Sequence, residues 1–367
     1  MFKNALRMPV KLLGIPLYLD LTFLLILPVL AWLIGSQLGP FIALTNLPID
    51  AKPLLEGWLP YLLGLVAALA LFASVVVHEL GHAVTARVYG VETERITLWL
   101  LGGMAHFKDM PRQRGAEAVV AVAGPITSLA LGGLCWILLN FVPVEMGGLY
   151  FVVVYTMYMN IVLAVFNMIP ALPLDGGRVL RSLLHLKMSR LRATEISARI
   201  SRVLAIILGL FGLLSFNVFL IILAFFIYIA VTAEAKHALF TETLSRFTVE
   251  SLMSHPVATI SPTTTVEAAM ERMFKEGRLA YPVRQGTGDI VGTIHINMIR
   301  DLPKESLVAT VMGPAPGKIQ AGQCADILFD EMIGEGKNRI LVVSPTGEIL
   351  GIITKTDLVR AIQIMAR

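Results

Sequence analysis

A five-residue run, His78-Glu79-Leu80-Gly81-His82, combines residue types that bind metal ions and move protons. Residues four apart share one face of an α-helix, so both imidazoles can reach a single metal ion. Glu79 would then point to the water on that ion and act as a general base. A pair of solvated histidines at a helix end is the alternative interpretation. The residue types and their spacing favour a hydrolytic metal centre.

The third ligand of such a centre must come from a distant segment, because a catalytic zinc site takes three protein ligands and keeps one position open. Asp175 is the candidate, since it is the only carboxylate between Glu145 and Glu195. It follows Asn167-Met-Ile-Pro-Ala-Leu-Pro-Leu, whose two prolines oppose a continuous helix and predict unwound backbone. A turn that merely caps the next helix is the alternative.

The elements that carry these residues are predicted to be membrane-spanning helices. Each of five stretches without Asp, Glu, Lys or Arg exceeds the roughly 20 residues that a helix needs to cross about 30 Å of hydrocarbon. These stretches are Leu21–Ile49, Gly57–Val77, Ala118–Val144, Met146–Leu174 and Val203–Ala233. The helices of a large soluble core rarely produce one such stretch, so five of them exclude that alternative. The histidine run follows the second stretch, at a depth where ionisable groups are usually functional.

The number of spans and their orientation follow from the last stretch and from the charges. That stretch has 31 residues, too long for one upright span, and Ser215-Phe216-Asn217 at its middle predicts a turn between two short helices. With six spans, 15 of the 16 Lys and Arg residues before residue 236 lie on one side of the membrane. This asymmetry predicts a cytoplasmic N terminus for a multi-pass protein of the cell membrane. Charge bias leaves five and six spans open, whereas the turn favours six and a cytoplasmic C terminus.

The overall composition agrees with a membrane protein. Hydrophobic residues make up 56% of the chain and charged residues 15%, and the mean hydropathy is +0.74. Soluble proteins average about 45–50% and about 25% for these two classes. This composition excludes a disordered chain and a basic nucleic-acid-binding protein, and two cysteines cannot build a disulfide framework. No direct nucleic-acid partner is expected, and the lipid bilayer is.

Residues 236–367 are more polar and repeat themselves at a shift of 59 residues. Gly288-Asp-Ile-Val-Gly292 in the first unit matches Gly347-Glu-Ile-Leu-Gly351 in the second. Each unit predicts a strand, an amphipathic helix (Thr265–Glu276 and Ala325–Glu335), two further strands around a glycine turn, and a helix. A two-unit repeat of this kind predicts two modules that bury a shared face.

At these residues the tail resembles a tandem pair of CBS domains, modules that often bind adenine nucleotides. The expected parts are a linker at 236–247, a first domain at 248–303 and a second at 304–367. Gly351-Ile-Ile-Thr354-Lys-Thr-Asp357 is similar to the family's nucleotide motif, which implies that Thr354 contacts phosphate and Asp357 the ribose hydroxyls of ATP or AMP. The first unit departs from this motif, with His295 and Met298 at the matching positions. A structural module that forms a homodimer without a ligand is the alternative.

The first 235 residues resemble the site-2 protease family of intramembrane zinc metalloproteases. The similarity lies in the histidine run, the Asn-Pro-Asp-Gly type segment 167–177 and Gly124-Pro125-Ile-Thr-Ser128, where several relatives have Asn in place of Ser128. A C-terminal CBS pair occurs on one branch of the family, which includes relatives of the sporulation factor processing protease. The resemblance implies a role for each site residue: zinc ligands His78, His82 and Asp175, general base and acid Glu79, and Asn167 at the substrate backbone or oxyanion.

The expected fold is therefore a polytopic α-helical membrane protein of about six transmembrane helices, followed by a soluble α/β tandem CBS module. The segment Leu100–His106 resembles the family's strand that pairs with extended substrate, and a plain cytoplasmic turn is its alternative. The implied activity is zinc-dependent hydrolysis of peptide bonds in transmembrane substrates near the cytoplasmic face. A membrane-bound transcription factor or anti-sigma factor is the kind of substrate expected.

Two other classes of function remain open at this point. A transporter or channel regulated by a CBS pair explains the spans and the tail, and a catalytically inactive membrane sensor keeps the scaffold alone. Neither accounts for a histidine run that is matched by a single carboxylate from an unwound segment. The chain also shows no inverted hydropathy repeat of the transporter kind.

Overall fold

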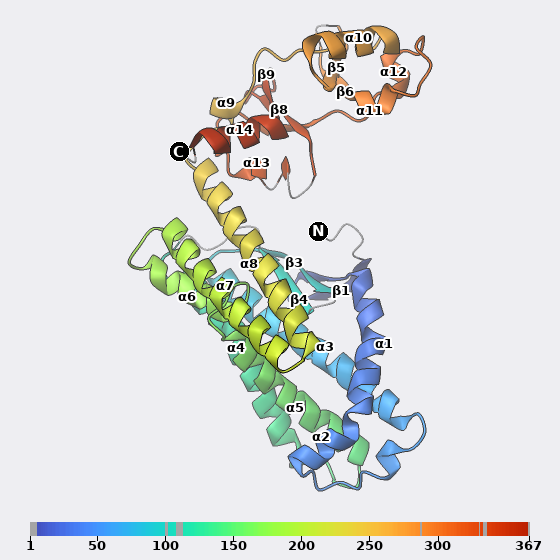
Figure 1. The fold of residues 1–367 in the computed structure, drawn as a ribbon, viewed down its shortest axis with the longest axis vertical. Helices are drawn as coiled ribbons and strands as arrows, with labels where there is room; N and C mark the ends of the chain where they lie inside the picture. Colours follow the sequence, from blue (N-terminus) through green and yellow to red (C-terminus); the bar gives the residue numbers. More distant parts are fainter. Residues whose placement is uncertain are drawn as a thin grey trace. The chain divides into compact units, whose positions relative to one another are not determined.

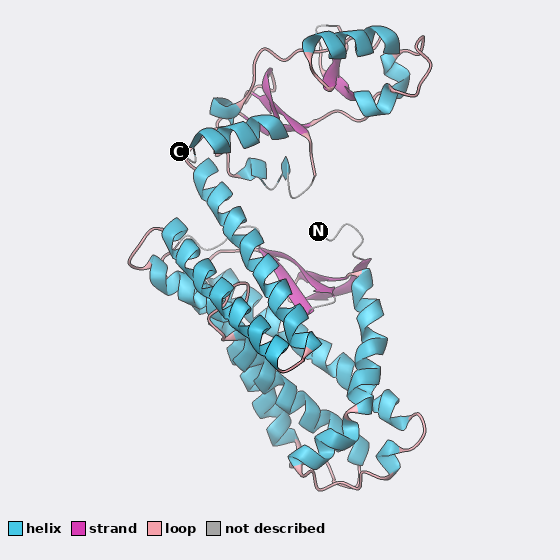
Figure 2. Cartoon of the chain, in the orientation of Figure 1, coloured by secondary structure: helices cyan, strands magenta, loops and turns pink. Residues whose placement is uncertain are grey.

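The chain divides into two compact units, Met1–Ala235 and Lys236–Arg367, which are described separately. Figure 1 labels the elements along the chain, and Figure 2 shows that helices dominate the first unit. The structure is a computed structural model. It describes residues 6–99, 102–107, 113–286, 288–329, 331–332 and 336–365.

The first unit is built from apolar helices. In the described residues, five helices are long and apolar enough to cross a membrane: α3 (Leu59–Val88), α4 (Ala116–Leu138), α5 (Gly147–Asn167), α7 (Arg190–Leu214) and α8 (Val218–Leu244). A bent pair, α1 (Leu21–Ser36) and α2 (Leu38–Thr45), makes a sixth candidate span, with an angle of 51° between its helices. The expectation of about six spans is confirmed. The chain is a multi-pass membrane protein.

The α1 helix packs unusually closely against α3. A Cβ atom on Gly64 would lie 2.2 Å from the carbonyl oxygen of Ala31, and one on Gly35 would lie 2.7 Å from that of Pro60. Both separations are shorter than any real contact, so only glycine fits at these two positions. Small residues allow such backbone approach between membrane helices, where dispersion forces replace the hydrophobic effect.

The predicted turn at Ser215-Phe216-Asn217 does separate two helices. The Asn217 side-chain oxygen accepts a hydrogen bond from the Leu220 N–H at 3.2 Å, which helps to start α8. The two helices are longer than expected, because α7 begins at Arg190, well before the charge-free stretch. The α8 helix also extends beyond that stretch. Residues 236–247, expected to be the linker, are helical as far as Leu244.

A four-stranded sheet lies at one end of this unit, beside α1 and α3 (Figures 1 and 2). Its strands follow the order β1 (Leu6–Leu12), β2 (Ile15–Leu19), β3 (Thr93–Trp99) and β4 (Gly102–Phe107). The β2–β3 pair is parallel and the other two pairs are antiparallel. Leu98 packs with Phe23 of α1 and with Phe72 and Val76 of α3, which fixes the sheet against the helix that carries the histidine run. The β4 strand is the edge of the described sheet on that side.

The second unit contains two small sheets, β5 (Ala280–Arg284) with β6 (Ile290–His295), and β7 (Gly317–Gln320) with β8 (Arg339–Val343) and β9 (Ile349–Thr354). Its helices are α9 (Val249–Leu252), α10 (Val266–Glu276), α11 (Ile296–Ile299), α12 (Val308–Val311), α13 (Ile327–Phe329) and α14 (Lys355–Met365). The predicted helix Thr265–Glu276 is α10, with Thr265 as its N-cap. Of the helix expected at Ala325–Glu335, residues 327–329 form α13, and 330 and 333–335 lie outside the described residues.

The cores of this unit do not follow the expected linear boundaries. Val249 lies in the core of the second repeat with Ile340, and Val308 lies in the core of the first. The reason is an exchange of short segments between the repeats. A Cβ atom on Gly351 would lie 2.6 Å from Met253 Sδ, and one on Gly292 would lie 2.6 Å from Met312 Sδ. The glycine in the last strand of each repeat therefore makes room for a methionine that precedes the other repeat.

Candidate metal centre

The α3 helix presents both histidines of the run on its buried face. His78 and His82 are only 3% and 5% exposed. Their Nε2 atoms lie 3.2 Å apart, as expected for imidazoles separated by four residues on a helix. The alternative of solvated histidines is wrong for these two side chains.

Asp175 reaches the same point from α6 (Asp175–His185), which begins where the proline segment ends. Residues 168–174 are not helical, as predicted, and the Leu172 N–H donates a hydrogen bond to the buried Ser201 Oγ at 2.8 Å. A Cβ atom on Gly176 would lie 2.3 Å from the carbonyl oxygen of Met168, so the start of α6 packs directly on this unwound backbone. Asp175 is thereby held at a fixed place while remaining 7% exposed.

The three side chains form a compact donor set. Asp175 Oδ2 lies 3.2 Å from His78 Nε2 and 3.3 Å from His82 Nε2. Two imidazole nitrogens and one carboxylate oxygen are the donors that catalytic zinc sites use. At Zn–N distances of about 2.0–2.1 Å, tetrahedral ligand atoms lie about 3.3–3.4 Å apart. The spacing and chemistry of these residues therefore fit a zinc ion, which they would bind with one position left open. In the described residues, no other group of three or more such side chains is close enough to hold a metal ion.

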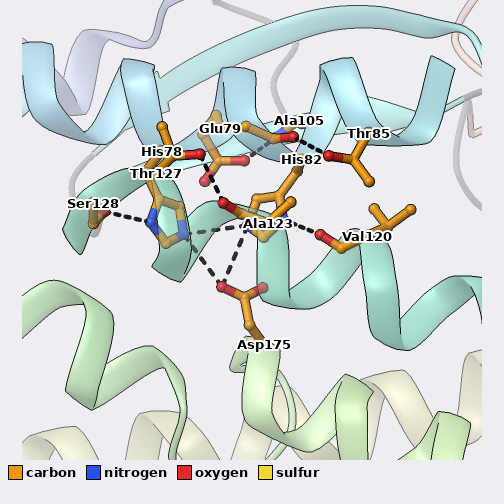
Figure 3. Close-up of polar contacts among 11 residues, drawn as sticks. His78, Glu79, His82, Thr85, Ala105, Val120, Ala123, Thr127, Ser128 and Asp175 are labelled. Atoms are coloured by element: carbon orange, nitrogen blue, oxygen red, sulfur yellow. Dashed lines mark hydrogen bonds and ion pairs between the residues drawn. The ribbon is translucent and has the colours of Figure 1, made fainter. Parts of the chain in front are cut away.

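Residues of α4 orient the two imidazoles (Figure 3). His82 Nδ1 lies 2.8 Å from the carbonyl oxygen of Val120, which can only accept, so Nδ1 carries a proton and Nε2 is the nitrogen that faces Asp175. His78 Nδ1 lies 2.8 Å from the fully buried Ser128 Oγ, which can accept in the same way. Partners of this kind fix the ring and raise the basicity of the ligand. Ser128, which departs from several relatives, thus contacts a candidate ligand directly.

Gly124 provides the space in which the imidazoles meet, a role that the sequence reading missed. A Cβ atom there would lie 2.2 Å from His82 Nε2 and 2.6 Å from His78 Nε2. Any side chain would therefore occupy the place where the donor atoms converge. The sequence shows only a glycine in the middle of an apolar span. It does not show that this glycine lies against the histidines of another helix.

Glu79 lies beside the donor set, on the side that faces β4 (Figure 3). Its Oε2 accepts a hydrogen bond from the Ala105 N–H of β4 at 3.1 Å. A Cβ atom on Gly103 would lie 2.8 Å from both Glu79 Cγ and Val75 Cγ1, so a glycine lets the strand approach α3. The segment expected at Leu100–His106 is a strand from Gly102 onward, and Leu100 and Leu101 lie outside the described residues. The plain-turn alternative is wrong for the described part.

Asn167 is the last residue of α5 and is half-buried. Among the described residues its side chain makes no hydrogen bond, and it does not belong to the donor set. The structure therefore brings four of the predicted residues together, His78, Glu79, His82 and Asp175, and leaves the role of Asn167 as a prediction.

In the second unit, Thr354 and Asp357 bind each other. The Thr354 N–H donates to Asp357 Oδ2 at 2.9 Å, and the Asp357 N–H donates to Thr354 Oγ1 at 3.3 Å. This reciprocal pair is a capping box at the start of α14. Asp357 Oδ1 also accepts from Ser254 Oγ at 3.1 Å. The motif therefore has a structural role at the start of α14.

A cavity of about 460 Å³ lies beside this capping box and is lined by residues 253–258, Arg278 and Ile352. Ser254 belongs both to the lining and to the hydrogen bond with Asp357. In the first repeat, His295 takes the place of Thr354 as an N-cap, because its Nδ1 accepts from the Asn297 N–H at 3.1 Å.

Comparison with known proteins places this geometry in a family. The model of peptidase family M50 matches residues 66–145 and 143–208, and that of the CBS domain matches residues 249–305 and 325–364. Over 358 residues the chain is 33% identical to a zinc metalloprotease of Methanocaldococcus jannaschii. This match covers 97% of this chain and 95% of that protein. The chain belongs to peptidase family M50. The predicted resemblance to site-2 proteases with a CBS pair is confirmed.

Two further similarities of this M50 peptidase are more partial. The chain is 27% identical over 192 residues to stage IV sporulation protein FB of Bacillus subtilis, a match that covers 51% of this chain and 65% of that protein. The solved structure of the site-2 protease from Methanocaldococcus jannaschii is 34% identical. That match covers 63% of this chain and 95% of the solved chain, with a TM-score of 0.45.

Proposed function

We propose that this M50 peptidase is a zinc endopeptidase that cuts transmembrane proteins near the cytoplasmic face of the membrane. One observation carries the proposal: the Nε2 atoms of two imidazoles on α3 and a carboxylate oxygen at the start of α6 lie within 3.3 Å of one another and are buried, although His78 and Asp175 are 97 residues apart. His78, His82 and Asp175 would hold the ion. When bound, zinc supplies Lewis-acid polarisation of the scissile carbonyl and makes the attacking water more acidic.

Glu79 moves the protons of the reaction. Its carboxylate accepts a proton from the attacking water, whose oxygen bonds to the carbonyl carbon. The same proton passes to the leaving amine as the carbon–nitrogen bond breaks, so Glu79 ends the cycle ionised. The Ala105 N–H holds one carboxylate oxygen at 3.1 Å and so orients the other. Asn167 is proposed to hold the substrate backbone or the oxyanion.

The substrate must present an extended segment. A helical backbone keeps its carbonyls in its own hydrogen bonds and cannot offer one for attack. The edge strand β4 contacts Glu79, and an extended peptide can add to such an edge through backbone hydrogen bonds. Substrates with helix-breaking residues near the cytoplasmic face are therefore expected, and membrane-bound transcription factors or anti-sigma factors are candidates.

Glu79→Gln is the variant that tests the protease assignment. We expect it to bind zinc as the wild type does and to cleave a membrane-embedded reporter about 10²–10⁴-fold more slowly, because the general base is lost. Zinc content and cleavage are measured on the same detergent-purified protein, with Glu195→Gln, at an exposed position of α7, as the control. Unchanged cleavage by Glu79→Gln would remove the proposal. Ion flux in liposomes that survives loss of all three ligands would favour the transporter, and zinc binding by the wild type without any cleavage would favour the inactive sensor.

We also propose that adenine nucleotides bind the second unit and change the activity. The cavity of about 460 Å³ lies within the range of small-molecule sites, and His255 and Arg278 on its lining can bind phosphate. Asp357 borders it through Ser254 and can accept two ribose hydroxyls. Thr354 would add a phosphate contact. A homodimer formed through this unit is the alternative role.

Calorimetric titration of the full chain with ATP and AMP tests nucleotide binding. We expect one site per chain and at least a tenfold loss of affinity for Arg278→Gln. Arg300→Gln is the matched control, since the Arg300 side chain is 73% exposed and lies outside the cavity lining. Thr354→Ala is less informative, because it also removes a helix cap. Absence of heat with both nucleotides would leave only the structural role.

A further inference from the structure

Arg181 forms a buried ion-pair cluster that joins three helices of the first unit. It lies on α6, is 5% exposed, and donates from Nε to Glu117 Oε1 of α4 at 3.0 Å, with Nη2 also on that oxygen. Its Nη1 donates to Glu234 Oε1 of α8 at 2.8 Å. An arginine at this depth is stable only while both carboxylates stay in place, because removing one partner leaves buried charge uncompensated.

The α6 helix ties this cluster to the candidate metal centre. Asp175 is its first residue, and Arg181 follows six residues later, about 9 Å along the axis at 1.5 Å per residue. The neighbouring Ser182 Oγ accepts from the Ala118 N–H of α4 at 3.1 Å. A helix of 11 residues moves as one body, so a displacement at Arg181 also displaces Asp175.

The two carboxylates hold Arg181 unequally. Glu117 binds two guanidinium nitrogens and its side chain is 12% exposed, whereas Glu234 binds one and is 24% exposed. Glu234 lies near the end of the first unit, on a helix that continues without a break to Leu244. Leu244 is itself fully buried in a core of the second unit. The weaker contact is therefore on the helix that joins the two units.

We propose that Arg181 is a positioning residue for the metal centre: it sets the place of Asp175 relative to the two imidazoles, and its bond to Glu234 makes that place depend on α8. The inference rests on the proposed zinc site. A change in the second unit would reach the ligand set along α8 and then through the Arg181–Glu234 pair.

Zinc affinity and the absorption spectrum of the cobalt-substituted full chain test this role. We expect Glu234→Gln to lower zinc affinity, measured against a chromophoric chelator, by about 10-fold, because displacement of α6 moves Asp175 away from the imidazoles; this is the lower end of the loss found when a direct partner of a metal ligand is removed. The cobalt spectrum should shift, because the geometry around Asp175 changes. Arg181→Gln should lose more, and Arg181→Lys should recover part of the affinity because it keeps the charge. Glu195→Gln is the control and should match the wild type.

The outcomes separate this inference from the proposed function. Wild-type zinc affinity and an unchanged cobalt spectrum in a folded Glu234→Gln protein would overturn the role of Arg181 and leave the zinc site standing. If Arg181→Gln does not fold, Glu234→Gln decides alone, since it keeps the Glu117 contact. A wild-type chain that binds no zinc would remove the proposed function instead. In a reporter assay, a lower kcat with an unchanged KM supports positioning, whereas a purely structural role would lower only the amount of folded protein.

Discussion

At the scale of single residues, the metal centre depends on two small residues of α4 that are not ligands themselves. Gly124 and Ser128 lie one turn apart on α4, and both act on the imidazoles of α3. Ser128 contacts the His78 ring at Nδ1. Gly124 has no side chain and so leaves open the space next to the Nε2 atoms of both histidines. Both residues are expected to control metal binding without being ligands.

Gly124→Ala is expected to abolish zinc binding, because its Cβ atom would lie 2.2 Å from His82 Nε2. Gly133→Ala, on the same helix, is the matched control, since a Cβ atom there meets nothing within 4 Å. Zinc content after dialysis, together with thermal unfolding in detergent, measures the effect. We expect the control to retain one zinc per chain. Normal zinc content in Gly124→Ala would show that the imidazoles do not converge as described.

At the scale of elements, the unwound segment 168–174 gives Asp175 its position. Such backbone is tolerated at membrane depth only where protein satisfies its polar groups. Ser201 of α7 does this for the Leu172 N–H at 2.8 Å, and its own hydroxyl donates to the Ser197 carbonyl oxygen at 2.7 Å. The short helix that follows then presents Asp175 at its first residue.

Ser201→Ala should therefore loosen this segment. It leaves the buried Leu172 N–H without a partner, which costs about 1–3 kcal/mol. We expect a lower unfolding temperature in detergent and weaker zinc binding. Ser215→Ala serves as the comparison, since Ser215 is exposed and its hydroxyl bonds only within its own helix end. Equal stability of the two variants would argue against a structural role for the Leu172–Ser201 bond.

At the scale of the whole molecule, the charge distribution predicts the orientation in the membrane. The first 235 residues hold 16 Lys and Arg against 12 Asp and Glu, and the remaining 132 hold 14 of each. The whole net charge of +4 therefore belongs to the membrane unit. Its concentration on one set of loops predicts a cytoplasmic N terminus, and the turn at Ser215-Phe216-Asn217, which favours six spans, predicts a cytoplasmic C terminus.

Cys324 offers a native probe of that orientation, because it is exposed whereas Cys135 is buried. We expect a membrane-impermeant maleimide to label the chain in inside-out vesicles and not in intact spheroplasts. Desolvation raises the pKa of the Cys324 thiol, so labelling is done at mildly alkaline pH. Cys324→Ser should lose the signal and so confirms which thiol reacts. Labelling in spheroplasts would place the second unit outside the cell.

Features of this protein that depend on local sequence patterns could be predicted, and features that depend on packing could not. The histidine run, the span count and the break at Ser215–Asn217 depend on local spacing and hydropathy, so they were predictable. The predicted helix from Thr265 is α10. The exchange of segments between the two repeats was missed, because Met253 and Gly351 are 98 residues apart and only packing shows that they meet.

The sequence by itself determined which residues could do chemistry and which segments lie in the membrane. Both follow from short-range patterns: helical spacing places two imidazoles on one face, and uncharged length sets the spans. The tertiary structure alone decided which neighbours complete the site. Gly124, Ser128, Ala105 and Arg181 act across helix and strand contacts that no spacing along the chain encodes. Close packing in three dimensions gives them their roles, because a distance of 2 to 3 Å between separate elements is a property of the fold.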